Sequence, residues 1–265
     1  MNPASSMKNY IIRYGEIGLK GLNRPFFENK LISNIKAVID DKTAKITKKP
    51  GRIIIETENN ISEQLKRVFG IVSFSIAERC EFDRLNDFII EKIKNKKFET
   101  FRITANRINK RFPKTSEDLA REIGAFVVEK LGKKVSLKEY DLNVQIEIID
   151  SAYVFFDRVQ CLGGLPVGVE GKSIVLLETK NGIEAAKRVM KRGCDIIPTS
   201  FKKINIDEIN DYLPVKKELI IIKDASEIDK IAVKQDARAL VVEDFFDNLK
   251  DYQTKLAVLR PLAFD

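Results

Sequence analysis

The sequence contains no histidine and no tryptophan, and it contains only three cysteines among its 265 residues. Without histidine the chain cannot form a Ser-His or Cys-His nucleophile pair or a histidine metal site. The cysteines, Cys80, Cys161 and Cys194, follow neither a disulfide framework nor a CxxC metal pattern. We therefore expect no metal site, and a reducing, cytoplasmic environment.

Long apolar runs are also missing. No segment approaches the roughly 20 apolar residues that a membrane helix needs, and the first residues do not resemble a signal peptide. The composition, 44% hydrophobic and 32% charged, is typical of a globular protein, and the length predicts two or three domains. We expect no association with a membrane.

The positive charge is unevenly distributed. The formal net charge is +8, and residues 172–265 hold 17 basic and 16 acidic side chains, which leaves seven of the surplus charges in residues 1–171. A basic surface of this kind suits a polyanion, because each neutralised phosphate releases counterions. An alternative that stays open is that the charge serves solubility alone.

Apolar periodicity predicts two α/β blocks in the first part of the chain. Residues 8–70 read as an α+β unit in the order β-α-β-β-α, with strands at 8–15, 44–48 and 52–56 and helices from Arg24 and at 61–69. Residues 71–162 form the second block, with strands at 71–77, 98–106, 142–149 and 152–156 and helices at 85–94 and 116–131.

A third block, residues 172–265, follows a linker at 163–171. Its short apolar runs, at 173–177, 195–201, 218–223, 239–242 and 257–259, predict a parallel sheet that is covered on both faces. Four acidic residues are expected near the carboxyl ends of these strands, Glu178, Glu243, Asp244 and Asp247.

The segment from Arg102 to Lys114 contains five basic residues and no acidic one. Phe112 within it offers a stacking surface for an unpaired base. The alternative is a solvated loop in which Arg102 and Phe112 belong to the core. We predict RNA contacts at Arg102, Arg107, Lys110, Arg111, Lys114 and Arg121, and a second patch on the first hairpin at Lys48, Lys49 and Arg52.

The turn after the strand at 173–177 stands where a parallel α/β unit binds phosphate through glycine N–H groups and a helix N-terminus. Here it reads Glu178, Thr179, Lys180, Asn181 and Gly182. A carboxylate at the start and a single glycine at the end predict a degenerate nucleotide loop.

Several ordered motifs resemble the tRNA 4-thiouridine synthase (tRNA sulfurtransferase) family, namely 13–27, 101–113, 121–125, 163–168 and 191–198. The resemblance implies a ferredoxin-like domain, a THUMP domain that binds the tRNA acceptor end, and a Rossmann-like PP-loop domain. It also implies a homodimer. The family's Ser-Gly-Gly-x-Asp-Ser loop, which holds ATP phosphates, is absent at 177–182, and we expect the PP-loop domain to be truncated.

The sequence therefore favours a tRNA-binding protein that has no catalytic residues and needs no cofactor, and no DNA partner is expected. Two alternatives stay open. One is an active tRNA sulfurtransferase, which would use ATP and magnesium through an altered site. The other is a non-catalytic subunit of an intact homologue.

Overall fold

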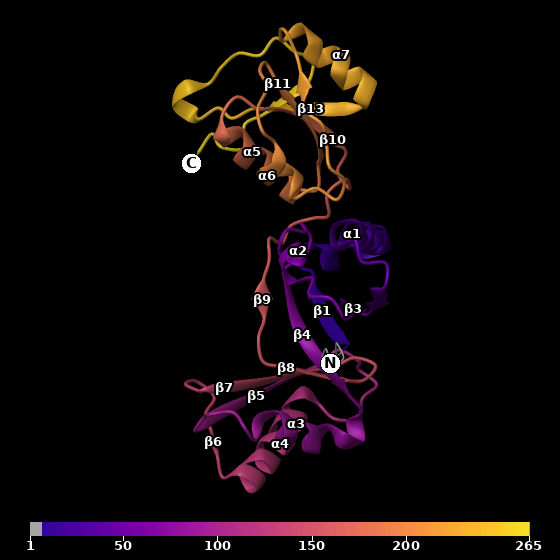
Figure 1. Ribbon diagram of the computed structural model, residues 1–265, viewed down its shortest axis with the longest axis vertical. Coiled ribbons are helices and arrows are strands. Elements are labelled where there is room, and N and C mark those ends of the chain that lie inside the picture. Colours follow the sequence, from indigo (N-terminus) through magenta and orange to yellow (C-terminus); the bar gives the residue numbers. More distant parts are fainter. Residues whose placement is uncertain (1–6, 265) are drawn as a thin grey trace, which may run out of the picture. The chain divides into compact units, whose positions relative to one another are not determined.

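The computed structural model describes residues 7–264, which fall into two compact units (Figure 1). The first unit contains residues 7–13, 43–60 and 73–159, and the second contains residues 14–42, 61–72 and 160–264. Each unit has its own sheet and its own buried cores.

The sheet of the first unit has the strand order β2-β3-β1-β4-β8-β7-β5-β6, and β9 (Val159–Gln160) pairs with β4. Its strands are β1 (Lys8–Arg13), β2 (Lys45–Lys49), β3 (Arg52–Thr57), β4 (Ser73–Cys80), β5 (Thr100–Arg107), β6 (Lys134–Val135), β7 (Leu142–Ile148) and β8 (Ala152–Phe155). The strand expected at 71–77 is β4, which pairs with β1 over residues 73–77 and with β8 over residues 78–80. One strand thus joins the two predicted blocks into a continuous sheet.

Two α-helices cover one face of the strands β5 and β7 in this unit (Figure 1). They are α3 (Leu85–Ile93), which follows the short helix η3 (Phe82–Arg84), and α4 (Ser116–Leu131). The Thr115 hydroxyl accepts a hydrogen bond from the Asp118 N–H at 3.1 Å and so begins α4, as the sequence predicts. The apolar face of α4 packs with Phe101 of β5 into a common core.

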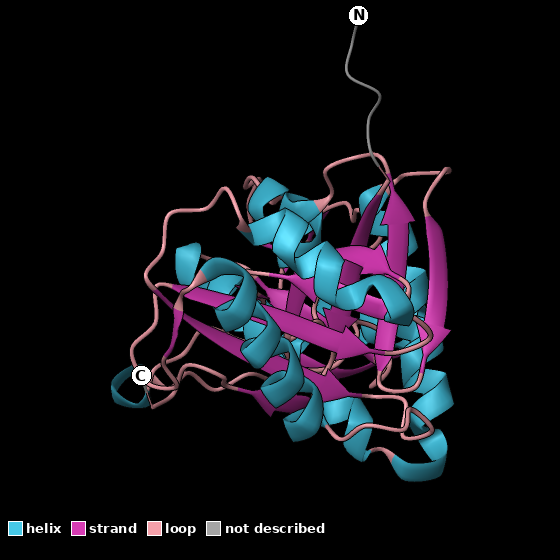
Figure 2. Ribbon diagram, turned by 90° about the horizontal axis from the view of Figure 1, so that it is seen from below, coloured by secondary structure: helices cyan, strands magenta, loops and turns pink. Residues whose placement is uncertain are grey.

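The sheet of the second unit is parallel throughout, in the order β12-β11-β10-β13-β14. Its strands are β10 (Lys172–Leu176), β11 (Asp195–Ser200), β12 (Ile220–Ile221), β13 (Ala237–Val241) and β14 (Ala257–Leu259). One core contains Val175 with Ala186 of α5 (Lys180–Lys191), and another contains Ile174 with Ile228 of α7 (Ser226–Gln235). The expected parallel sheet with two covered faces is therefore confirmed. Figure 2 shows the helices and strands of the chain in separate colours.

The second unit also includes helices from the N-terminal part of the chain. These are η1 (Glu16–Leu19), η2 (Gly21–Asn23), α1 (Arg24–Ile39) and α2 (Ser62–Lys66), and the later chain adds α6 (Asp207–Asn210) and η4 (Phe246–Asn248). The segment expected to be a linker at 163–171 is tied to them, because Val167 O accepts a hydrogen bond from Asn34 Nδ2 at 3.0 Å. Leu165 N also donates to Lys191 O at 2.9 Å.

None of the helices within residues 7–264 has the length and apolarity needed to cross a membrane.

Candidate nucleic-acid interface

The loop between β5 and α4 presents Lys110, Arg111 and Lys114 to solvent, and the first part of α4 adds Arg121. Lys110 and Arg111 are exposed, and within residues 7–264 their side chains make no hydrogen bond or ion pair. Lys114 pairs with Glu122, and Arg121 pairs with Glu117 at 3.0 Å. Exposed pairs of this kind are weak, so both cations remain available to a phosphate.

Arg102 lies at the opposite end of β5 from this loop. It is five residues before Arg107, which corresponds to about 16 Å at roughly 3.3 Å per residue. Its Nη1 atom donates to Leu137 O at 3.3 Å, and its guanidinium lies 5.8 Å from the centre of the Tyr140 ring. Arg107 instead donates to Phe112 O at 3.1 Å. The basic segment of the sequence is therefore divided between two places on the sheet.

Phe112 is half-buried and packs against the core formed by α3, α4 and the sheet. Its ring centre lies 4.9 Å from that of Phe82, which is 37% exposed. The structure thus favours the alternative in which Phe112 belongs to the core. It is not a free stacking platform for a base.

Two of the predicted RNA contacts on the first hairpin, Lys49 and Arg52, are paired with carboxylates of the unit. Lys49 pairs with Asp150 at 2.8 Å, and Arg52 donates to the buried Glu147 at 2.7 Å. Arg13 donates to the same carboxylate at 2.9 Å. Burial raises the pKa of Glu147, but the hydrogen bonds and charges of Arg52 and Arg13 outweigh it and hold the pKa below its ordinary value.

The remaining hairpin residue, Lys48, lies on β2 beside Lys49. The acidic partners of Lys49 and Arg52 come from the far end of the unit's sequence, 101 and 95 residues away. No local pattern in the sequence could have indicated them.

The turn between β10 and α5 contains the predicted degenerate loop. Thr179 begins the helix, and its hydroxyl accepts a hydrogen bond from Asn181 N at 3.1 Å. Its own N–H donates to Glu243 Oε2 at 3.1 Å. Gly182 is buried so closely that an added Cβ would lie 2.8 Å from the same oxygen. A carboxylate of the chain itself therefore faces the start of the helix.

Other acidic residues gather nearby, as the sequence predicts, and are neutralised by neighbours. Glu178 pairs with Lys250 at 2.8 Å. Asp244 is 3% exposed, and it accepts hydrogen bonds from Tyr252 OH at 2.8 Å and Arg260 Nε at 3.2 Å. Burial and the bond to Asp244 raise the pKa of Tyr252. Across the described chain, no group of three or more Cys, Asp or Glu side chains is placed to hold a metal ion.

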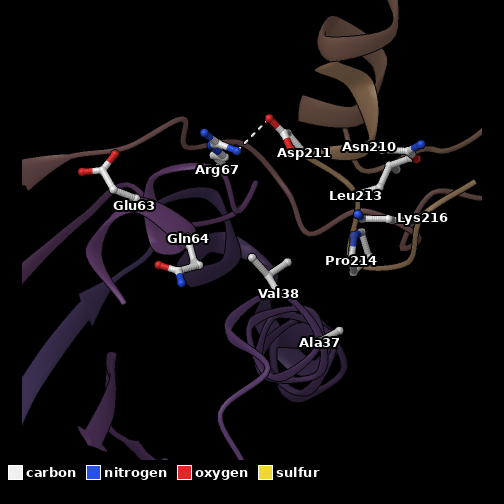
Figure 3. Close-up of a pocket in the computed structure, with 10 residues that line it drawn as sticks. All are labelled: Ala37, Val38, Glu63, Gln64, Arg67, Asn210, Asp211, Leu213, Pro214 and Lys216. Carbon is white, nitrogen blue, oxygen red and sulfur yellow. Dashed lines mark ion pairs between the residues drawn. The ribbon is translucent and has the colours of Figure 1, made fainter. Parts of the chain in front are cut away.

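A cavity of about 410 Å³ lies elsewhere in the second unit, between the ends of α1 and α2 and the segment 210–216 (Figure 3). Arg67 and Asp211 form a 2.7 Å ion pair at its edge. None of the predicted site residues lines it, and no sequence signal indicated it. Its lining is Ala37, Val38, Glu63, Gln64, Arg67, Asn210, Asp211, Leu213, Pro214 and Lys216.

Two family models match the chain. The model of the ThiI ferredoxin-like domain matches residues 9–75, and the model of the THUMP domain matches residues 82–157. The basic loop and Arg102 lie within the second match.

Curated relatives resemble the chain over most of its length. A probable tRNA sulfurtransferase from Alkaliphilus oremlandii is 39% identical over 202 residues, covering 70% of this chain and 51% of the relative. One from Thermococcus kodakarensis is 39% identical over 208 residues, covering 71% and 54%. The chain thus spans about half the length of the curated relatives it matches.

Two solved structures share the fold. PH1313 from Pyrococcus horikoshii is 28% identical with a TM-score of 0.84, and the match covers 97% of this chain and 95% of that one. A 4-thiouridine synthetase, solved with RNA and bound ATP, is 24% identical with a TM-score of 0.77, and the match covers 98% and 82%.

Proposed function

We propose that this chain, which carries a ThiI ferredoxin-like domain and a THUMP domain and so resembles the tRNA 4-thiouridine synthase family, is a tRNA-binding protein of tRNA modification. We expect the THUMP domain to contact the acceptor end of the tRNA, as the family resemblance implies. The homodimer that the resemblance implies remains a prediction.

The observation that carries the proposal is the exposed basic surface within the THUMP match that is formed by the loop between β5 and α4 and by Arg121 of α4. Lys110 and Arg111 are exposed, and Lys114 and Arg121 are held only by exposed carboxylates. Replacing a weak surface pair by a phosphate contact costs little, and each phosphate contact releases counterions. These four side chains are therefore the main proposed phosphate contacts, while Arg102 and Arg107 belong to the strand itself.

Binding of fluorescently labelled tRNA, followed by anisotropy between 50 and 200 mM salt, tests this proposal. We expect an affinity that falls steeply with salt and that exceeds the affinity for a DNA duplex of equal length. Equal affinity for tRNA and for the DNA duplex would mean that binding is non-specific charge attraction alone. That result would contradict the proposal.

We further propose that the chain lacks ATP-dependent uridine activation. A phosphate at the start of α5 would need backbone N–H donors and space for close approach. The Thr179 N–H donates to Glu243, whose carboxylate would repel a phosphate. The residues of this turn do not fit the triphosphate of ATP.

Calorimetric titration with ATP and magnesium, alone and with tRNA present, distinguishes this reading from the alternative. The alternative is an active tRNA sulfurtransferase, which the names of the curated relatives favour. We expect no heat of binding up to millimolar ATP. Micromolar binding would support the enzyme and would contradict the loss of the ATP step.

A further inference from the structure

The strand β12 forms one edge of the parallel sheet in the second unit, and its outer side has no partner strand within residues 7–264. It pairs only with β11. Ile222 N donates to Ser200 O of β11 at 3.0 Å. Because successive residues of a strand direct their N–H and C=O groups to opposite sides, those of Ile221 point away from β11. This edge can therefore accept a further strand.

The segment around β12 has more strand character than its two paired residues use. The sequence predicts a strand at 218–223, but β12 contains only Ile220 and Ile221. These two residues and Ile222 are β-branched, a class that is enriched in strands. Ile221 is 55% exposed. A strand added at the outer edge would lengthen β12 and cover part of this apolar side chain.

A cavity of about 320 Å³ lies beside β12. Its lining includes Ile197, Pro198 and Ile220, together with Lys216. In strand addition the backbone of the incoming segment supplies hydrogen bonds, and pockets for its alternate side chains supply specificity. The cavity thus offers an apolar place for one side chain of an added strand.

Exposed lysines lie at both ends of β12. Lys216 precedes the strand and Lys223 follows it, while Lys202 and Lys203 come directly after the neighbouring β11. Within residues 7–264 none of the four forms an ion pair. Glu218 is the one acidic residue in the sequence from 216 to 223. An acidic partner therefore complements the charge of this edge.

The same features disfavour two other occupants. Pairing of two copies through β12 would bring the lysines of both copies together, and like charges on paired strands are destabilising. An RNA strand would meet the lysines, but it has no backbone amides to pair with Ile221 and no aliphatic side chain for the cavity. The edge therefore suits an extended polypeptide.

We propose that the edge of β12 binds an extended acidic segment of a partner protein by strand addition. The backbone of the segment pairs with Ile221, and one of its apolar side chains enters the cavity beside Ile220. Its carboxylates contact Lys216 and Lys223. This interaction is separate from the tRNA binding proposed for the first unit.

The test measures the binding of a fluorescently labelled peptide of alternating glutamate and valine, about ten residues long, by anisotropy. We expect saturable binding with one peptide per chain. A second peptide carries N-methyl groups on two consecutive central amides, which block both edges of the peptide strand and leave its charge unchanged. It should bind at least about tenfold more weakly, because backbone hydrogen bonds are lost.

Three variants locate the binding site. Ile221→Pro removes the N–H that faces the partner, and an edge strand tolerates proline where its N–H faces solvent. It should weaken peptide binding at least about fivefold. Lys216→Gln/Lys223→Gln should also weaken binding, and more so at low salt. The matched control Lys36→Gln/Lys234→Gln removes the same charge from α1 and α7 and should leave binding unchanged.

Absence of peptide binding, or equal binding of the N-methylated peptide, would overturn the inference. A dimer of the unaltered protein that Ile221→Pro abolishes would overturn it too, because a second copy would then occupy the edge. If Lys216→Gln/Lys223→Gln lowered the affinity for tRNA and the control did not, the surface would belong to RNA, and the inference would again be wrong.

Discussion

At the scale of single residues, Glu147 is the buried charge on which the first unit depends. It is fully buried on β7 and receives hydrogen bonds from Arg13 of β1 and Arg52 of β3. Its loss would leave two guanidinium groups without their shared carboxylate, and Arg13 is itself only 6% exposed. A buried charge without its partner is strongly unfavourable.

Glu147→Gln should lower the free energy of opening of β7 by about 3 kcal/mol at pH 7. Because the folded pKa of Glu147 lies below its ordinary value, the stabilisation is full above the unfolded pKa of about 4.3 and is lost as pH falls through the folded pKa. Hydrogen exchange of the β7 amides should therefore show a difference that is constant from pH 7 to about 5 and shrinks below about 4.

The control for this measurement is Glu129→Gln, which removes an exposed carboxylate paired with Lys130. It should change the same exchange rates by less than about 0.5 kcal/mol. A difference for Glu147→Gln that grows as the pH falls would contradict the assigned role.

At the scale of secondary-structure elements, the start of α5 depends on the close packing of Gly182. An added Cβ would lie 2.8 Å from Glu243 Oε2 and 3.0 Å from Leu177 Cδ2. The Glu243 carboxylate would have to move, and its hydrogen bond with Thr179 N would be lost. This packing is local to the turn between β10 and α5.

Gly182→Ala should destabilise the second unit by about 1 kcal/mol, because the steric cost exceeds the helix propensity that alanine adds. Hydrogen exchange of α5 measures the effect. Gly18→Ala is the matched control, since nothing lies within 4 Å of its added Cβ. If Gly182→Ala made the protein more stable, the Glu243 carboxylate would not be packed against Gly182 as described.

Local signals explain which elements the sequence predicts well. The helix expected at 116–131 is observed with the same bounds. Thr115 before its start and Gly132 after its end are local signals that fix them. The strand expected at 218–223 is reduced to the two residues of β12, since only these pair with β11. Strand length depends on a partner strand, which the segment's own pattern does not contain.

The predicted site is recovered less completely than the fold. Composition identifies the basic segment. It does not show that Arg102 and the loop lie at opposite ends of β5. Lys49 and Arg52 look free in the sequence, yet their carboxylates come from β7 and the turn that follows it.

At the scale of the whole chain, the distribution of positive charge and the two domain matches both support the binding of tRNA. Seven of the eight surplus positive charges lie in residues 1–171, which contain both matched domains. Residues 172–265 are nearly neutral, and two of their acidic residues, Glu178 and Glu243, lie at the turn where the family resemblance would place ATP. We therefore propose RNA binding for the first part and no ATP-dependent step for the second.

The most direct test is the salt dependence of tRNA binding by Lys110→Ala/Arg111→Ala/Lys114→Ala, measured beside the unaltered protein. Each lost phosphate contact should reduce the slope of log affinity against log salt by about one. We predict weaker binding at 50 mM salt and a slope shallower by about two to three. An unchanged slope would contradict the assignment of tRNA binding to this loop.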